Sequence, residues 1–265
     1  MNTDYNRVLE APPTGRQRAM WTVGFVLIWW AVSALDVINA LLLPSPFSVL
    51  EAVFNIGSTL VVHVLATGSR ALVGLMLGTL CGVGIGLSVR FSGILTRTIE
   101  PMLDASRPVP TVALLPFFIL IFGFSEAGRI TLVGLSVAII IAVATVEAAE
   151  TIPERWFRFP VVSGFSRMRL FYAIVLPAII PSLRGPLRIA LSVSFTLVIA
   201  SEFMGAQQGI GYLINVARIN LATPTIVLCI FLLGAIAQFM DICLNELINR
   251  MTFWYQGART TLRSE

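Results

Sequence analysis

The sequence predicts an all-α integral membrane protein with six transmembrane helices. Its 265 residues are 57% hydrophobic and only 12% charged, about half the charged fraction that is typical of soluble domains. So few charges cannot cover a water-exposed surface, and most of the exterior must face lipid. Crossing a bilayer takes roughly 20 mostly apolar residues. Such segments lie at 19–42, 67–89, 105–124, 129–147, 182–203 and 223–246.

The distribution of arginine predicts the topology of these spans. Fifteen of the 18 arginines lie in the two tails and in the segments 90–107 and 147–188, whereas Arg70, Arg129 and Arg218 lie on the opposite side. Loops rich in basic residues stay in the cytoplasm, so we expect both termini there. The predicted divisions are an N-terminal tail at 1–18, a first helix with an outer-surface helix at 19–58, a main transmembrane domain at 59–248 and a C-terminal tail at 249–265.

Two segments on the outer side are not plain loops. The segment 43–60 follows a proline-rich turn and is predicted to be a short amphipathic helix lying on the membrane surface. The segment 205–224 is rich in glycine and too polar to cross, so it is predicted to be a re-entrant or surface lid. The first span has a tryptophan cluster and no small-residue cleavage site, which indicates a retained anchor rather than a signal peptide.

The absence of lysine limits the chemistry of the chain. All 18 basic residues are arginine, so the chain has no P-loop lysine for ATP. Any ATP-driven work therefore requires another subunit. The net charge is +4, and the arginines that produce it lie in the breaks between spans. Their position reflects topology rather than nucleic-acid binding. The three cysteines have no CxxC spacing and His63 stands alone, so we expect no metal site.

Glycines and prolines modify two of the predicted spans. Span 67–89 has a glycine at every fourth position, a spacing that lets a second backbone approach one helix face; these are Gly74, Gly78, Gly82 and Gly86. The pattern predicts close helix packing and leaves a contact with a second copy open. Prolines at 108, 110 and 116 predict a broken helix in span 105–124, as transporters have around their path.

A charged segment that also contains large apolar side chains lies between the fourth and fifth spans. Trp156, Phe157, Phe159, Phe171 and Tyr172 occur among its arginines. A solvated loop needs no such side chains, whereas an amphipathic helix pair inserts them into the groove of a partner. The pattern therefore favours a cytoplasmic projection that docks on another protein.

The stretch "SGFSRMRLFYAIVLPAIIPSLRGPLRIAL" resembles the coupling loop of type I ATP-binding-cassette (ABC) importer permeases. In that family a Glu-Ala-Ala triplet stands six residues before a glycine, and Leu-Pro follows twelve and thirteen residues after it. Gly164 and Leu176-Pro177 match this spacing. The triplet slot holds Arg158-Phe159-Pro160 instead, and the visible Glu147-Ala148-Ala149 lies seventeen residues before Gly164.

This resemblance implies a MetI-like permease fold with cytoplasmic coupling helices. By the same resemblance, the residues that contact the ATPase are Trp156, Phe157, Arg158, Phe159, Pro160, Gly164, Arg167, Leu170, Phe171, Leu176 and Pro177. The altered triplet slot removes the acidic contact with the ATPase and leaves docking by shape and apolar contact.

Three further stretches resemble the aliphatic-sulfonate, taurine and nitrate importer permeases: "LPSPFSVL", "RPVPTVALLPFFILIFGFSEAGRI" and "SEFMGAQQGIGYLI". The subgroup also imports thiamine-precursor pyrimidines, so the resemblance does not identify the solute. The implied complex has two ABC ATPase subunits that hold ATP and Mg²⁺, a second permease copy in a homodimer or heterodimer, and a periplasmic or lipid-anchored solute-binding protein. The implied location is the bacterial inner membrane, and the chain itself is a transport subunit without a cofactor.

Ionisable and special residues near the spans are candidates for the translocation path, because buried charge in a membrane is costly. The candidates are Arg70, Pro108, Pro110, Phe118, Ser201 and Glu202. Glu202 is either a contact of the outer vestibule or an interfacial acid paired with Arg70 or Arg218. Arg70, Arg107, Arg129 and Arg188 are candidates for an electropositive route for an anion, and Arg107 and Arg188 also suit the role of cytoplasmic anchors.

Two other functions remain open from the sequence. A self-sufficient channel or secondary carrier predicts paired acids deep in the bilayer, and the uncharged centres of most spans argue against it. A degenerate permease paired with a better-preserved one would explain the altered triplet slot.

Overall fold

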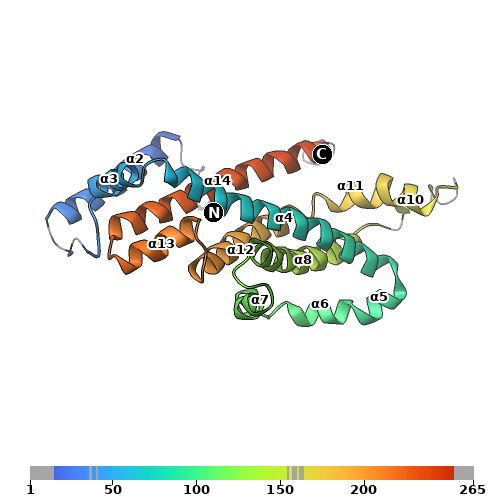
Figure 1. Cartoon of the computed structure of the whole chain (residues 1–265). Coiled ribbons are helices and arrows are strands. Elements are labelled where there is room, and N and C mark those ends of the chain that lie inside the picture. Colours follow the sequence, from blue (N-terminus) through green and yellow to red (C-terminus); the bar gives the residue numbers. More distant parts are fainter. Residues whose placement is uncertain are drawn as a thin grey trace, which may run out of the picture. The chain divides into compact units, whose positions relative to one another are not determined.

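The computed structural model describes residues 15–35, 38–39, 41–153, 155–156, 160 and 164–253. Every regular element in these residues is helical, as the sequence predicted (Figure 1). The chain forms two compact units. The smaller comprises the residues up to Gly57 together with Val216–Leu228, and the larger comprises Ser58–Asn215 with the residues from Cys229 onward.

The smaller unit contains α2 (Gly15–Ala34) and α3 (Pro46–Ile56). The helix of the predicted first span ends at Ala34, well before residue 42. The surface helix predicted at 43–60 is α3, where the Ser45 hydroxyl caps the Ser48 N–H at 3.1 Å and Pro46 occupies the first turn. Gly57, at φ 62°, ends the helix. The Trp29 indole donates to the Pro44 carbonyl at 3.0 Å and ties α2 to the approach to α3.

In the part of the chain that the structure describes, four helices are long and apolar enough to cross a membrane. They are α4 (Thr59–Phe91), α8 (Glu126–Glu150), α12 (Arg184–Phe203) and α14 (Thr223–Met251). A bent helix pair counts as a fifth span if its halves form one crossing. Within the described residues α2 contributes an apolar helix at Ala19–Ala34, which is shorter than a span. The count of six spans therefore stays a prediction.

The bent pair overlaps the third predicted span, 105–124, which is not one straight helix. α6 (Glu100–Ser106) is followed by the 3₁₀ turn η1 (Thr111–Leu114) and by α7 (Leu115–Phe122), and the two parts meet at 94°. Pro108 and Pro110 lack the N–H groups that would continue α6, so the chain turns there. The proline pattern thus sets the position of the break.

The core of the larger unit is the contact of α4 with α8, which run side by side in Figure 1. A Cβ atom on Gly78 would lie 2.5 Å from the Gly134 carbonyl oxygen, and one on Gly86 would lie 2.5 Å from the Ala142 carbonyl oxygen. Gly74 and Gly82 face α8 equally closely. The glycine row therefore lets two backbones touch within one chain. α12 adds Leu191, Phe195 and Val198 to the same core.

Short helices join the spans of the larger unit. α5 (Gly93–Thr98) precedes α6, and the connection from α8 to α12 contains α10 (Arg167–Leu170), the π-helical turn η2 (Phe171–Val175) and α11 (Leu176–Ile179). The predicted lid at 205–224 contains the helix α13 (Ile210–Ile219).

Candidate functional site

A buried ion pair joins two helices that are far apart in the sequence. Arg70 Nη1 of α4 lies 2.6 Å from Glu202 Oε1 of α12. The two residues are only 6% and 1% exposed. A buried charge is tolerated only when it is paired and hydrogen-bonded, so these helices are held in one register. Of the two partners considered from the sequence, Glu202 pairs with Arg70.

Two further charges extend this pair into a charged cluster of Arg70, Glu126, Arg129 and Glu202. Glu126, in the first turn of α8, accepts two hydrogen bonds from Arg70, at 2.6 and 2.7 Å. It also accepts one from Arg129 Nη1 at 2.7 Å. Two guanidinium groups and two carboxylates balance, so the charged cluster is neutral as a whole. It joins the beginnings of α4 and α8 to the end of α12.

The charged cluster also holds the turn that leads from α12 into α13. Arg70 Nη1 donates to the Gln208 carbonyl at 2.7 Å, and Arg129 Nη2 donates to the Gly205 carbonyl at 3.0 Å. The Gly211 N–H donates to Glu202 Oε2 at 2.8 Å. Gly205 has a φ of 145°, a backbone conformation that residues other than glycine rarely adopt. The predicted lid is therefore fastened at its first turn.

Two polar side chains of α4 complete these hydrogen bonds. The Thr67 hydroxyl contacts both Glu202 oxygens at 2.9 and 3.0 Å and accepts the Ile210 N–H at 2.8 Å. His63 Nδ1 accepts the Gly209 N–H at 3.0 Å, and the imidazole stacks on Tyr212. His63 thus has a structural contact, and among the described residues no group of three or more His, Cys, Asp or Glu side chains is placed to hold a metal.

Four of the six path candidates are enclosed in this structure. Arg70 and Glu202 lie in the charged cluster, and the Ser201 hydroxyl donates to the Val198 carbonyl at 2.7 Å. Phe118 and Ser201 line a cavity of about 10 Å³ with Arg129, room for about one water molecule. Pro108 and Pro110 are exposed at the bend between α6 and α7. A path role for these six stays a prediction.

The arginines weighed as an anion route differ in their surroundings. Arg70 and Arg129 are buried and satisfied by carboxylates, so neither guanidinium is free to hold a solute. Arg107 pairs with Asp104 at 3.1 Å and with Glu147 at 2.8 Å. Arg188 pairs with Asp241 at 2.7 Å, yet its side chain is 55% exposed. Of these four, Arg107 and Arg188 are open to solvent or a partner.

The predicted coupling segment begins with residues that the structure describes only in part. Phe157, Arg158 and Phe159 lie outside the described residues. Arg167 begins α10, and its side chain lies outside the described part as well. Trp156 is 47% exposed. Pro160 is half-buried and its carbonyl accepts the Phe165 N–H at 3.0 Å.

Gly164 has a φ of 73°, which glycine adopts without strain. It lies just before α10. The Arg169 guanidinium then lies over the Phe165 ring, 4.5 Å from its centroid. Leu170, the last residue of α10, is half-buried.

The segment from Phe171 onward packs on the end of α8. Val175, Ile179 and Leu183 are buried against Ala148, Ala149 and Leu87 of α8 and α4, with Phe171 and Leu176 alongside. Pro177 stands at the start of α11 directly after the π-helical turn, where its missing N–H removes one regular helix bond. The coupling segment is therefore anchored to the helix pair that forms the core.

The Glu147-Ala148-Ala149 triplet has a role that sequence reasoning missed. Its two alanines are 6% exposed and form the surface on which the coupling segment packs. The Glu147 carboxylate accepts from Arg107, the residue just after α6. The sequence did hold a signal for this role. Ala148 and Ala149 follow Glu147 directly on the last turn of α8, and the helical period places the alanines and the acid on different faces.

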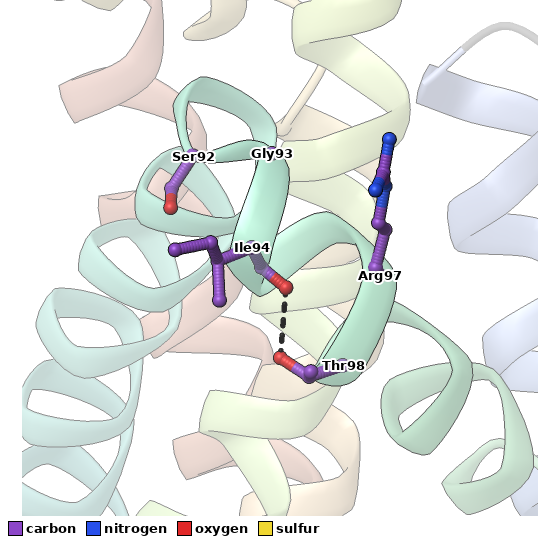
Figure 2. Close-up of a pocket in the computed structure, with 5 residues that line it drawn as sticks. All are labelled: Ser92, Gly93, Ile94, Arg97 and Thr98. Atoms are coloured by element: carbon purple, nitrogen blue, oxygen red, sulfur yellow. Dashed lines mark hydrogen bonds between the residues drawn. The ribbon is translucent and has the colours of Figure 1, made fainter.

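A surface hollow at α5 does not contain these groups. It is lined by Ser92, Gly93, Ile94, Arg97 and Thr98, all from α5 and the turn before it. Figure 2 shows the Thr98 hydroxyl bonded to the Ile94 carbonyl, while the Arg97 side chain extends away from them. Only one of these five residues is charged, so the hollow holds no cluster of charged groups. We attribute it to the shape of the turn before α5.

Comparison with known proteins agrees with this arrangement. The family model described as "Binding-protein-dependent transport system inner membrane component" matches residues 74–252. The taurine transport system permease protein TauC of Escherichia coli (strain K12) is 28% identical over 86% of either chain. SsuC of the same organism, whose name refers to aliphatic sulfonates transport, is 30% identical over 89% of this chain and 90% of its own length.

Among solved structures, a chain of the MetNI methionine ABC transporter in an inward-facing conformation aligns with a TM-score of 0.65. The identity is 20%, and the match covers 75% of this chain and 98% of the other. At that identity the likeness shows the fold, which is the predicted MetI-like permease fold. The family match confirms the resemblance to importer permeases. The chain therefore belongs to the family of binding-protein-dependent transport system inner membrane components and is the permease subunit of an ABC importer.

Proposed function

We propose that this permease forms the path for a small sulfonate-like anion that a solute-binding protein delivers. The observation that carries the solute class is the similarity to TauC over 86% of both chains. SsuC, with a name that points to the same chemical group, supports it. Taurine carries a sulfonate, so both names indicate one oxygen-rich anionic head group.

The proposed complex has two permease copies and two ABC ATPase subunits. ATP and Mg²⁺ would be held by the ATPases, since this chain lacks lysine for a P-loop. We propose a homodimer, with a heterodimer as the outcome to test. The arginine distribution supports an inner-membrane orientation with both termini in the cytoplasm. The coupling segment would then face the ATPases.

The anchoring of the coupling segment supports a mechanical link between the subunits. Trp156 and Tyr172 are 47% and 61% exposed, which leaves apolar surface for a partner. The other side of the segment is buried on Ala148 and Ala149 of α8 through Val175 and Ile179. A displacement of the exposed side by the ATPase would reach α8, and through the glycine row it would reach α4. Coupling requires only that the segment bind the two ATPase states with different affinity.

The solute class is tested with the associated binding protein and the reconstituted transporter. Taurine, an alkanesulfonate, nitrate and a neutral pyrimidine are offered to the binding protein, and each solute is then assayed for ATP-dependent uptake into proteoliposomes. We expect the sulfonates to bind and to be taken up only with ATP. Uptake of the pyrimidine with no response to either sulfonate would overturn the proposal.

The number of permease copies is tested by coexpressing the chain with two different affinity tags. Recovery of both tags in one purified complex is expected for a homodimer. Recovery of a single tagged copy with a different permease would establish a heterodimer.

A further inference from the structure

A row of polar side chains follows one face of α12. Its members recur at every fourth position and all are exposed: Arg184, Arg188, Ser192 and Thr196. This spacing places them one above another along the helix. Ser192 and Thr196 lie at the middle of a helix that is apolar enough to cross a membrane.

A second polar row follows α14 and faces the first. It consists of Gln238, Asp241 and Asn245, which share one helix face. Arg188 binds the Asp241 carboxylate through two bonds of 2.7 and 2.9 Å. Arg184 donates to the Asn245 amide oxygen at 3.2 Å.

These contacts fix the relative register of two antiparallel helices. Each step of four residues up α12 corresponds to four residues back along α14, which brings Ser192 to the level of Ala237, the neighbour of Gln238. Gln238 is exposed and lies midway along α14. The two rows together, called the polar ladder below, run from the start of α12 to the middle of both spans.

Lipid is a poor environment for the polar ladder. Charged side chains within a membrane span are costly unless they face protein or water, and Gln238 places an amide group midway along α14. The Arg188 side chain is 55% exposed, whereas the Arg70 and Glu202 side chains of the charged cluster are 7% and 0% exposed. The charged cluster is sealed by its own helices, but the polar ladder is open and needs water or a second protein surface.

Direct contact between the polar ladders of two permease copies would be electrostatically unfavourable. Two arginines and one aspartate give the ladder a net positive charge, and Arg184 bonds to a neutral amide. A twofold interface places the same patch of each copy against itself. Positive charge would then face positive charge, so water and an anion are required between the copies.

We propose that the polar ladder lines the translocation path and that Arg184 and Arg188 bind the anionic head group of the passing solute. A guanidinium group matches the oxygen geometry of a sulfonate or carboxylate. Asp241 holds Arg188 in place until the solute anion takes its position on the guanidinium. The inference deepens the proposed function and rests on its anionic solute class.

Water access is tested by placing single cysteines in the complete transporter. Cys81, Cys229 and Cys243 are first replaced, and Ser192→Cys and Gln238→Cys are introduced one at a time. Met76→Cys and Leu80→Cys are the matched controls, because both lie at mid-span on α4 and are 56% and 71% exposed. A membrane-impermeant methanethiosulfonate reagent is applied with and without ATP.

We expect both polar-ladder variants to react in at least one nucleotide state and both controls to stay unreacted. Absence of reaction at both ladder positions in every state would overturn the inference. Disulfide-linked dimers of Ser192→Cys without reagent access would also overturn it, because they would assign the row to a dry subunit contact.

The role of charge is tested by comparing negatively and positively charged reagents at Gln238→Cys. A nearby net positive charge speeds the negative reagent relative to the positive one, by about tenfold at separations near 10 Å. We expect Arg188→Gln and Arg184→Gln to remove most of that ratio. An unchanged ratio in both variants would contradict anion binding by the ladder.

These outcomes are separate from the solute test. Labelling requires no solute, so failed sulfonate uptake with intact labelling would refute the solute class and leave the path assignment standing. Sulfonate uptake without labelling would refute the path assignment alone.

Discussion

Arg70 of α4 and Glu202 of α12 form a buried ion pair, with 2.6 Å between Nη1 and Oε1, although 132 residues separate them. Glu126 adds two more bonds to the same guanidinium group. Because the pair is buried, removing one partner leaves an uncompensated charge inside the bundle.

Glu202→Gln and Arg70→Gln are therefore expected to be strongly destabilising, by about 3–5 kcal/mol. The measurement is the thermal unfolding of the detergent-purified transporter. The matched control is Arg107→Gln, which breaks exposed ion pairs with Asp104 and Glu147 and should cost about 1 kcal/mol or less. Equal losses in the buried and the exposed variants would contradict a structural role for the charged cluster.

The glycine row of α4 provides a test of helix packing within one residue type. Gly78→Ala places a methyl group 2.5 Å from the Gly134 carbonyl oxygen, so α4 and α8 must separate. We expect a loss of about 1–3 kcal/mol together with a lower yield of folded protein. Gly84→Ala is the control, since no atom lies within 4 Å of its new methyl group. A stability loss as large in Gly84→Ala would show that packing is not the cause.

Gly164 allows a test of the coupling segment by backbone conformation. Proline fixes φ near about −65°, whereas Gly164 has a φ of 73°, so Gly164→Pro must change the course of the segment. We expect membrane insertion to persist and copurification of the ATPase to be lost. Removal of 156–172 should have the same effect.

The control for this variant is Gly93→Pro. Gly93 is the first residue of α5, a position that accepts proline because its N–H has no partner within the helix. This variant should retain the ATPase. Full copurification with Gly164→Pro would show that the segment around Gly164 does not carry the contact.

The sequence predicts those features of the fold that depend on local pattern. The glycine spacing of α4, the proline break after α6 and the helix at 43–60 each follow from a few neighbouring residues, and the structure contains all three. The break also shows the limit of hydropathy, because the apolar window at 105–124 begins at the end of α6 and runs across the 94° bend into the next helix.

Features that depend on which helices meet were not predictable in the same way. Glu202 had two candidate partners, and only the positions of α4 and α12 select Arg70 over Arg218. The polar ladder was hidden because Ser192, Thr196 and Gln238 are isolated polar residues within apolar spans. Their common surface emerges only when the Arg188–Asp241 pair sets the register.

The Glu147-Ala148-Ala149 triplet illustrates the same limit. Its distance from Gly164 along the chain rules it out as the family's triplet. That distance says nothing about which residues meet in space. In the structure the coupling segment folds back, so that Val175 and Ile179 reach Ala148 and Ala149.

The central claim is that this permease moves its solute only by means of ATPase subunits that dock on its coupling segment. The most direct measurement compares solute uptake into liposomes that contain the purified permease alone with uptake into liposomes that contain the permease, its ATPase and the binding protein. We predict uptake in the complete system with ATP and none with the permease alone. Solute accumulation by the permease alone, without any nucleotide-hydrolysing partner, would contradict the account.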